Sequence, residues 1–243
     1  GIGKAIVLEL AKNHYDVVIN YLTSNKAAAL LEEEIKKNYD VRVMTIQADV
    51  SKEEEVDAMI SLIEKKWGGV DILINNAAVD LSNLFHLKTA DEFRKTLDVN
   101  VVGAFNCSKR VYRHMLDQEY GRIINISSTS GLYGTPKLAT YCMSKWGILG
   151  LTKTLAKEVG SKGIIVNALC PTKVKTPMCE TMEYVQFIND LTGKDFKSVE
   201  EMYNGVPFLD VEDISSMVYW LGTSREAGKF NGREVALDLG TLQ

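Results

Sequence analysis

Short runs of apolar, β-branched residues alternate along the chain with segments in which apolar residues recur every three or four positions. The runs have the length of buried strands, and the segments between them have the period of amphipathic helices. The predicted strands are Val17–Asn20, Val41–Gln47, Ile72–Asn75, Ile123–Ser127, Ile164–Leu169 and Glu234–Leu237. Because strands buried on both faces and joined through helices pair in parallel, this alternation predicts an α/β fold with a three-layer, doubly wound parallel sheet.

Several helix limits can also be predicted. One helix is expected to start at Ser51, because Ser51 and Glu54 have the spacing of a capping box. The other helices are expected from about Ala90 past Tyr112, from Tyr141 through Leu155, and over Val211–Leu221 with Asp210 as its cap. Since no repeat, low-complexity tract or linker interrupts the pattern, residues 1–243 are expected to form a single domain.

The chain opens directly on an amphipathic helix, with the sequence Gly1-Ile2-Gly3-Lys4-Ala5. A doubly wound sheet has a strand before this helix and a glycine turn between the two. We therefore expect that the first, central strand is missing from this sequence and that residues precede Gly1. Without that strand, both neighbouring strands would leave backbone groups unpaired. The alternative is a flexible N-terminus.

Composition restricts the classes of function. A chain of 243 residues with 46% hydrophobic content can bury a large core. The sequence contains no apolar run of 18 residues, so no membrane span is predicted. The net charge of −4 argues against nucleic acid, and no polybasic block indicates a membrane surface. No export signal is seen, so a cytoplasmic protein with reduced thiols is expected. No metal is expected, because zinc-site spacing is absent among the three histidines and the four cysteines, Cys107, Cys142, Cys170 and Cys179.

Tyr141 and Lys145 are the first candidates for catalysis. They are four residues apart and therefore share one face of a helix. An ammonium group close to a phenol favours the phenolate and lowers its pKa from about 10. Tyr141 is thus a candidate proton donor and acceptor. Ser128 ends an apolar strand thirteen residues upstream, and Asn100 lies further upstream. The alternative interpretations are that Ser128 only ends a strand and that Asn100 completes a buried polar network.

In this order and at these separations, Asn100, Ser128, Tyr141 and Lys145 resemble the Asn-Ser-Tyr-Lys tetrad of the short-chain dehydrogenase/reductase family. The resemblance extends from Gly1 to about Gly240. It implies a Rossmann fold and hydride transfer between a nicotinamide and a carbonyl or secondary alcohol, with no metal required. Ser128 would hydrogen-bond the reacting oxygen and Tyr141 would deliver the proton. Lys145 would hold the nicotinamide ribose and stabilise the phenolate, while the main chain or amide of Asn100 would fix a water that links Lys145 to solvent.

The resemblance also implies which residues contact the dinucleotide. Besides Tyr141 and Lys145, four segments are expected to contact it. They are the end of the glycine turn (Gly1, Ile2 and Gly3) and the end of the third strand (Asp49 and Val50). The other two are the family's N-N-A-G segment (Asn76, Ala77 and Ala78) and its P-G-x-x-x-T segment (Pro171, Val174 and Thr176). For Asp49 the alternative interpretation is a helix N-cap region. Ala78 and Thr172 stand where the family has glycine. Ala78 would carry a steric cost if its φ angle were positive, and Thr172 changes a wall of the active site.

The choice between NAD(H) and NADP(H) depends on the end of the second strand of the fold. A carboxylate there accepts a hydrogen bond from the ribose 2′-hydroxyl and repels a 2′-phosphate. This chain has Asn20 and Tyr21, followed by hydroxyl side chains and Lys26, with no acid. NADP(H) is therefore favoured, and NAD(H) is the alternative.

Residues 176–208 are the expected substrate lid. This segment contains the apolar residues Met178, Met182, Tyr184, Phe187, Ile188, Phe196, Met202, Tyr203 and Phe208. A mobile lid over an apolar, bulky alcohol or ketone is one interpretation, and ordinary packing is the other. Pro171–Met178 resembles the carveol-dehydrogenase-like branch, which favours a carbonyl reductase of this kind.

Two alternative functions remain open. Val79–Phe85 and Gly150–Lys153 resemble the 3-oxoacyl-[acyl-carrier-protein] reductases of fatty acid synthesis. An acidic carrier protein requires a basic face, whereas Asp117 and Glu119 have the wrong sign. The second alternative is a non-catalytic, dinucleotide-sensing protein on the same fold. The resemblance also implies a homodimer or homotetramer formed through helices at about Ala90–Glu119 and Ala139–Val159.

Overall fold

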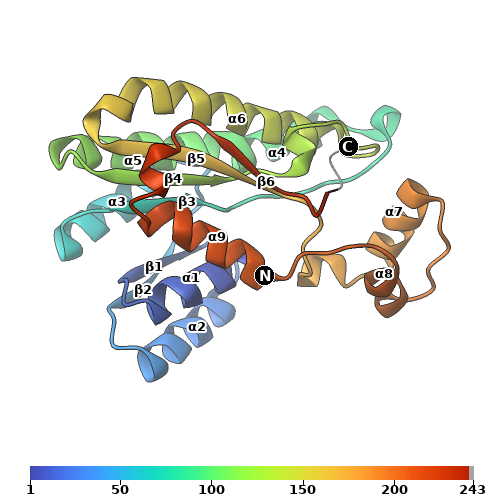
Figure 1. The fold of residues 1–243 in the computed structure, drawn as a ribbon, viewed down its shortest axis with the longest axis horizontal. Helices are drawn as coiled ribbons and strands as arrows, with labels where there is room; N and C mark the ends of the chain where they lie inside the picture. Colours follow the sequence, from blue (N-terminus) through green and yellow to red (C-terminus); the bar gives the residue numbers. More distant parts are fainter. Residues whose placement is uncertain (241–243) are drawn as a thin grey trace.

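A computed structural model describes residues 1–240 as parallel strands enclosed between two layers of helices (Figure 1). The strands are β1 (Val17–Tyr21), β2 (Val43–Gln47), β3 (Ile72–Asn75), β4 (Gly121–Ile126), β5 (Ile164–Pro171) and β6 (Glu234–Leu237). Every pairing among them is parallel. The predicted α/β class and the doubly wound parallel sheet are confirmed, and each predicted strand is present with ends shifted by at most two residues.

The helices cover both faces of the strands. They are α1 (Ile2–Lys12), α2 (Asn25–Asn38), α3 (Glu53–Trp67), α4 (Ala90–Leu97), α5 (Gly103–Asp117), α6 (Ala139–Val159), α7 (Met182–Thr192), α8 (Val199–Gly205) and α9 (Val211–Thr223). Residues of α1, α2 and α9 share one buried apolar cluster, and residues of α3, α5 and α6 share a second. The two clusters are therefore the two cores of a three-layer fold.

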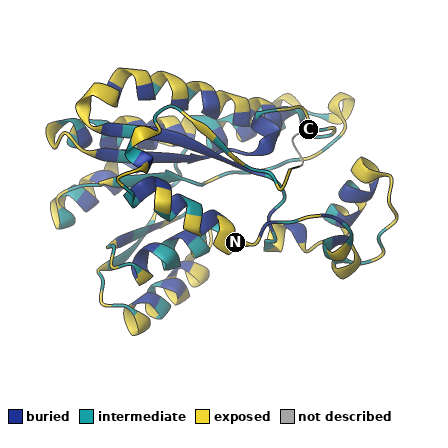
Figure 2. Cartoon of the chain, in the orientation of Figure 1, coloured by how far each residue is buried: buried dark blue, intermediate teal, exposed yellow. Residues whose placement is uncertain are grey.

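The alternation of side chains along each strand explains why two cores form. On β4, Ile124 and Ile126 belong to the core with α1 and α9, whereas Ile123 belongs to the core with α3 and α5. Successive residues of a strand point to opposite faces, so apolar residues at consecutive positions, such as Ile123 and Ile124, supply both cores. Figure 2 shows the result, with β4 and β5 buried and the outer faces of the helices exposed.

The strands are divided into a pair and a group of four. The hydrogen-bonded orders are β1-β2 and β3-β4-β5-β6, and within residues 1–240 no strand joins β1 to β3. A cavity of about 720 Å³ lies at this division, lined by Val17–Ile19 of β1, Ile72–Asn75 of β3 and apolar residues of α1. Asn100 and Lys145 are also among the residues that line this cavity. The division lies where the sequence predicts a further, central strand.

The start of α3 differs from the prediction. The helix begins at Glu53 after Lys52, and no side chain caps it, so the proposed Ser51–Glu54 capping box is wrong. Ser51 instead donates from its backbone N–H and hydroxyl to Asp49 Oδ1, at 3.0 and 2.7 Å. Glu55 accepts a hydrogen bond from the Asp49 N–H at 2.7 Å. The local turn made by Asp49 therefore competes successfully for the hydroxyl that would have capped the helix.

The helix predicted from Ala90 past Tyr112 is present but is not a uniform α-helix. A π-helical turn, Asp98–Val102, separates α4 from α5. Thr89 and Glu92 form a capping box at the start of α4, and the predicted cap of α9 by Asp210 is confirmed as a capping box with Asp213. The π-helical turn contains Asn100, and such turns occur often at functional sites.

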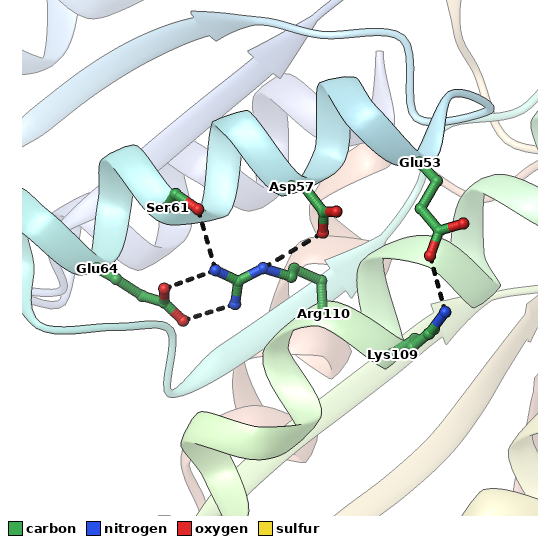
Figure 3. Close-up of polar contacts among 6 residues, drawn as sticks. All are labelled: Glu53, Asp57, Ser61, Glu64, Lys109 and Arg110. Atoms are coloured by element: carbon green, nitrogen blue, oxygen red, sulfur yellow. Dashed lines mark hydrogen bonds and ion pairs between the residues drawn. The ribbon is translucent and has the colours of Figure 1, made fainter.

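Ion pairs fix α5 against α3 on the outer surface (Figure 3). Arg110 donates two hydrogen bonds to Glu64, at 2.8 and 2.7 Å, and its guanidinium also reaches Ser61 and Asp57. Lys109 donates to Glu53 at 2.7 Å. The two-point contact between a guanidinium and a carboxylate adds directional specificity. This network therefore holds the helix that directly follows the π-helical turn.

Helices α7 and α8 lie apart from the strands and have a small core of their own (Figure 1). That core consists of the buried residues Val185, Ile188, Met202 and Val206. The chain enters and leaves this part through a short parallel contact, in which the Lys175 N–H donates to the Leu209 carbonyl and the Leu209 N–H donates to the Lys173 carbonyl. None of the helices within residues 1–240 is long and apolar enough to span a membrane.

Candidate active site

The four candidate catalytic residues come together at the carboxyl end of β4. Ser128 follows this strand, Tyr141 and Lys145 lie on α6, and Asn100 lies in the π-helical turn. The Lys145 Nζ donates to the carbonyl of Ile126 at 2.8 Å and lies 5.3 Å from the centre of the Tyr141 ring. A side-chain hydrogen bond joins Tyr141 to Ser128. Residues distant in sequence thus converge on one phenol.

Asn100 is buried and its amide is occupied by protein groups. Its Oδ1 accepts from the Val79 N–H at 2.8 Å, and its Nδ2 donates to the Val79 carbonyl and to Ser144 Oγ, both at 3.0 Å. An amide nitrogen has two hydrogens, so both are used here. The amide oxygen accepts this one hydrogen bond and has two lone pairs, so a water could still be held by this oxygen or by the main chain. The side chain of Asn100 also fixes the segment that follows β3.

The pKa of Tyr141 departs from the prediction. Burial and, to a smaller extent, the charge of Asp80 raise the pKa of the phenol well above its ordinary value of 10, while the hydrogen bond with Ser128 lowers it. The expected lowering by Lys145 does not prevail, because taking a phenolate out of water disfavours the charged form. In this structure Tyr141 therefore carries its proton at neutral pH.

The ammonium group of Lys145 is also strongly perturbed. Burial lowers its pKa from 10.5 to about 8, against smaller opposing effects of Cys170 and Asp80. The side chain is only 3% exposed. A lysine with such a pKa can lose its charge near physiological pH, which is a property typical of functional sites.

The first turn of α1 lies beside two of the predicted cofactor residues. A Cβ added at Gly3 would lie 2.9 Å from Nδ2 of Asn76, and one added at Gly1 would lie 3.9 Å from the Cβ of Thr176. No side chain caps this helix, so its first N–H groups point outward. A pyrophosphate fits such a helix N-terminus, and glycine permits its close approach. Ile2, in the same turn, packs against the core.

The end of β1 carries Asn20 and Tyr21, and both side chains have protein partners. The Nδ2 of Asn20 donates to the carbonyls of Ile46 and Ala48, at 3.3 and 3.0 Å. The hydroxyl of Tyr21 donates to Asn25 Oδ1 at 3.3 Å. Asn20 therefore ties β1 to β2, whereas Tyr21 extends toward the start of α2.

Asp49 and Val50 follow β2, as predicted. The Oδ1 of Asp49 accepts hydrogen bonds from Ser51, just before α3. This oxygen therefore has the role of the alternative interpretation, in which Asp49 belongs to a helix N-cap region. The Val50 carbonyl accepts from Asn106 Nδ2 at 3.0 Å. Its side chain lies so close to Gly103 that an added Cβ there would be 2.6 Å away. Val50 is thus held against the start of α5.

The two segments that depart from the family pattern show no backbone strain at the departures. Asn76, Ala77 and Ala78 follow β3, and Ala78 is not among the residues with positive φ, so its methyl group carries no such cost. Pro171 ends β5, and the Thr172 N–H donates to the Leu237 carbonyl at 2.9 Å. Val174 is buried beside Leu209. Within residues 1–240 no group of three or more acidic, histidine or cysteine side chains could hold a metal ion.

Asp80 is a residue of this site that the sequence reasoning did not single out. It follows Val79, and its charge acts on both Tyr141 and Lys145. The signal in the sequence was a lone carboxylate two positions after Ala78, in the segment that follows the strand Ile72–Asn75.

Comparison with known proteins identifies the family. The family model of the short chain dehydrogenases matches residues 1–184. A 3-oxoacyl-[acyl-carrier-protein] reductase of Staphylococcus epidermidis is 38% identical over 86% of each chain. A short-chain dehydrogenase/reductase of Armillaria gallica is 36% identical over the whole of this chain and 92% of that protein.

Solved structures agree with this assignment. NAD+-bound xylitol dehydrogenase has a TM-score of 0.87 and 28% identity, over 97% of this chain and 93% of that chain. ElxO with NADP bound has a TM-score of 0.83 and 31% identity, over 98% and 93% of the two chains. The chain therefore belongs to the short-chain dehydrogenase/reductase family of oxidoreductases that use a nicotinamide dinucleotide.

Proposed function

We propose that this protein transfers hydride between a nicotinamide dinucleotide and a carbonyl or secondary alcohol, with Tyr141 as the group that moves the proton. The observation that carries the proposal is the convergence of Tyr141, Ser128 and Lys145 at one end of β4. The first turn of α1 meets Asn76 and Thr176, which supports a dinucleotide site. When bound, the nicotinamide supplies or accepts the hydride.

Each residue of the proposed tetrad has a distinct role. Ser128 donates a hydrogen bond to the reacting oxygen, where negative charge grows during reduction. Tyr141, protonated at neutral pH, delivers a proton to the same oxygen. Lys145 holds the nicotinamide ribose and stabilises the phenolate that is left. Asn100 acts as a positioning residue, because its amide fixes Val79 and Ser144.

The proposed dinucleotide site extends along the carboxyl ends of the strands. Gly1, Ile2 and Gly3 bring backbone N–H groups to the pyrophosphate. The other contacts are proposed to come from Asn20 and Tyr21 at the ribose, Asp49 and Val50 at the adenine, and Asn76, Ala77, Ala78, Pro171, Val174 and Thr176 along the nicotinamide half.

NADP(H) is the proposed preferred cofactor, and Tyr21 offers a test. Tyr21→Asp places a carboxylate where a 2′-phosphate would be repelled and a 2′-hydroxyl could donate a hydrogen bond. We expect the ratio of kcat/KM for NADPH to kcat/KM for NADH to fall at least about tenfold, given the size of charge repulsion near a protein surface. Steady-state kinetics with both cofactors measure it. General damage would lower both values together, and an unchanged ratio would contradict the assignment.

We propose that residues 176–208 form a substrate lid on a single-domain protein. The segment has its own core around Val185 and Met202, and it joins the body through the contact at Val174 and Leu209. An ion pair between Lys137 and Asp190 connects it to the loop that precedes α6. Exposed apolar side chains, including Phe85, Met178 and Met182, support an apolar, bulky substrate, as in a carbonyl reductase.

A second candidate is the reduction of 3-oxoacyl groups on an acyl carrier protein. The 38% identity to the reductase of S. epidermidis favours it. Turnover of acetoacetyl thioesters and of cyclic ketones, followed at the nicotinamide absorbance, separates the two: a preference for the thioester would replace the first proposal. Tight dinucleotide binding without turnover of any compound would instead favour the sensing protein.

We also propose a homodimer or homotetramer formed through α5 and α6. Val111 and Leu149 are buried in the cores and cannot serve, but Trp146 is 54% exposed, and Phe105 on α5 and Met143 on α6 are exposed as well. Trp146→Glu is expected to lower the mass measured by light scattering toward that of one chain, because a buried unpaired charge disrupts an apolar interface. Leu30→Glu, at a 56% exposed position on α2, is the control. A Trp146→Glu protein that keeps its assembly would contradict the proposal.

A cytoplasmic location is proposed from the cysteines. Cys107, Cys142, Cys170 and Cys179 are free and buried. Thiols persist in a reducing compartment, whereas secreted domains pair them as disulfides.

A further inference from the structure

We propose that Asp80 determines specificity by accepting a hydrogen bond from a substrate hydroxyl group on the carbon next to the reacting one, with Lys88 donating to the same hydroxyl. The substrate class is then an apolar alcohol or ketone that carries one neighbouring hydroxyl. This inference rests on the proposed function, because it adds a polar contact to the same candidate active site.

The loop that carries Asp80 is fixed at both ends. Next to Asp80, Val79 is held through its N–H and its carbonyl by Asn100, at 2.8 and 3.0 Å. Further along, the Asn83 N–H donates to the carbonyl of Lys137 at 3.0 Å. Asp80 is therefore placed by the same amide that contacts Ser144 on the helix of Tyr141 and Lys145.

Asp80 and Lys88 each have a polar atom that is shielded from solvent without a protein partner. The Oδ1 of Asp80 and the Nζ of Lys88 have no hydrogen bond to any group within residues 1–240, and no ion pair there joins the two side chains. The two charges nevertheless act on each other. Leaving such atoms unpaired is costly. A hydroxyl group is a small ligand that satisfies both, because it donates to a carboxylate and accepts from an ammonium group.

The position of Asp80 relative to the proposed chemistry indicates which hydroxyl it binds. Its charge acts on Tyr141 and on Lys145, and also on Tyr184 of α7. Burial raises the pKa of Asp80, while Lys88 and Lys145 lower it. A carboxyl group offers an acceptor oxygen in either protonation state. Asn100 joins Val79, next to Asp80, to Ser144, next to Lys145, so we infer that a group bound by Asp80 lies beside the carbon whose oxygen Tyr141 serves.

Two matched probes test the inference, cyclohexanol and cyclohexane-1,2-diol, which differ by one neighbouring hydroxyl. With the wild-type protein and NADP+, we expect kcat/KM for the diol to exceed that for cyclohexanol about 10–100-fold, the range expected for one hydrogen bond to a charged group. Calorimetry on the same protein with the dinucleotide bound is expected to show correspondingly tighter binding of the diol.

Variants of Asp80 connect this preference to the carboxylate. Asp80→Ala is expected to reduce the diol-to-cyclohexanol ratio to within about threefold of unity, because the acceptor is gone. Asp80→Asn keeps an acceptor oxygen and the shape of the side chain, so an intermediate ratio is expected. Asp91→Asn is the control, since this carboxylate is 94% exposed on α4, and its ratio should equal the wild-type value. Thermal melts identify any variant that fails to fold, and the Asp80→Asn protein then decides.

The outcomes separate this inference from the proposed function. If neither compound is turned over but the diol binds more tightly, and only while Asp80 is present, the hydroxyl contact of Asp80 stands while hydride transfer on this class of alcohol is contradicted. If both compounds are turned over and the diol-to-cyclohexanol ratio of kcat/KM is the same in the wild-type and Asp80→Ala proteins, the inference is overturned and hydride transfer stands. Calorimetric binding of the diol that is no tighter than that of cyclohexanol also overturns it.

Discussion

Replacing Tyr141 by phenylalanine is expected to lower kcat by about 10²–10⁴-fold, the usual contribution of a positioned acid or base. The ring keeps its place on α6, but the oxygen that would exchange the proton is removed. Burial and Asp80 hold the pKa of this phenol high, so the wild-type group is the acid form that reduction requires. Single-turnover reduction of a ketone, followed at the nicotinamide absorbance, measures the loss.

Tyr133→Phe provides the matched control for this experiment. Tyr133 lies in the loop before α6, and its hydroxyl donates to Thr129 Oγ1 at 3.2 Å, so the variant loses the same atom from another tyrosine. Dinucleotide binding is measured for both variants by fluorescence. A Tyr141→Phe protein that reduces the ketone as fast as the wild type would show that Tyr141 is not the proton donor.

Much of the fold was predictable because the strands are encoded locally. Ile123, Ile124 and Ile126 form an apolar run with one polar residue, Asn125, inside it, and such a run predicts a strand that is buried on both faces wherever the rest of the chain goes. The candidate tetrad was recognisable for a related reason. Tyr141 and Lys145 share one helix face, and Ser128 follows a strand, so short-range spacing carries most of the geometry.

What the sequence did not reveal depends on contacts between distant segments. The capping of α3 by Ser51 failed because Asp49 takes the same hydroxyl. The pKa of Tyr141 was predicted in the wrong direction, because a four-residue spacing to Lys145 says nothing about burial or about a carboxylate on the loop after β3. Asp80 lies within Val79–Phe85, a segment whose resemblance to the 3-oxoacyl reductases gave this residue no role of its own. Its importance is visible only once the fold sets it beside α6.

Replacing Lys145 by methionine is expected to stabilise the protein at pH 7 and to lower kcat by about 10²–10³-fold, as loss of one electrostatic contact to the reacting groups does elsewhere. Burial lowers the pKa of Lys145 from 10.5 to about 8. At 1.36 kcal/mol per pKa unit, the buried charge costs the folded state roughly 3 kcal/mol. Methionine has a similar length and no charge, but it loses the hydrogen bond to Ile126, worth about 1 kcal/mol. The net gain is therefore roughly 2 kcal/mol.

The pH dependence of this gain distinguishes relief of a buried charge from better packing. Below pH 8 the wild-type lysine is charged in both the folded and unfolded states, so the full cost is present. Between about 8 and 10.5 the unfolded state binds the extra proton and the folded state does not, so wild-type stability rises with pH relative to the variant. Urea unfolding of both proteins at pH 7 and pH 9.5 measures the difference, which we expect to shrink at the higher pH. A gain of equal size at both values would mean that packing, rather than the charge of Lys145, opposes folding at this site.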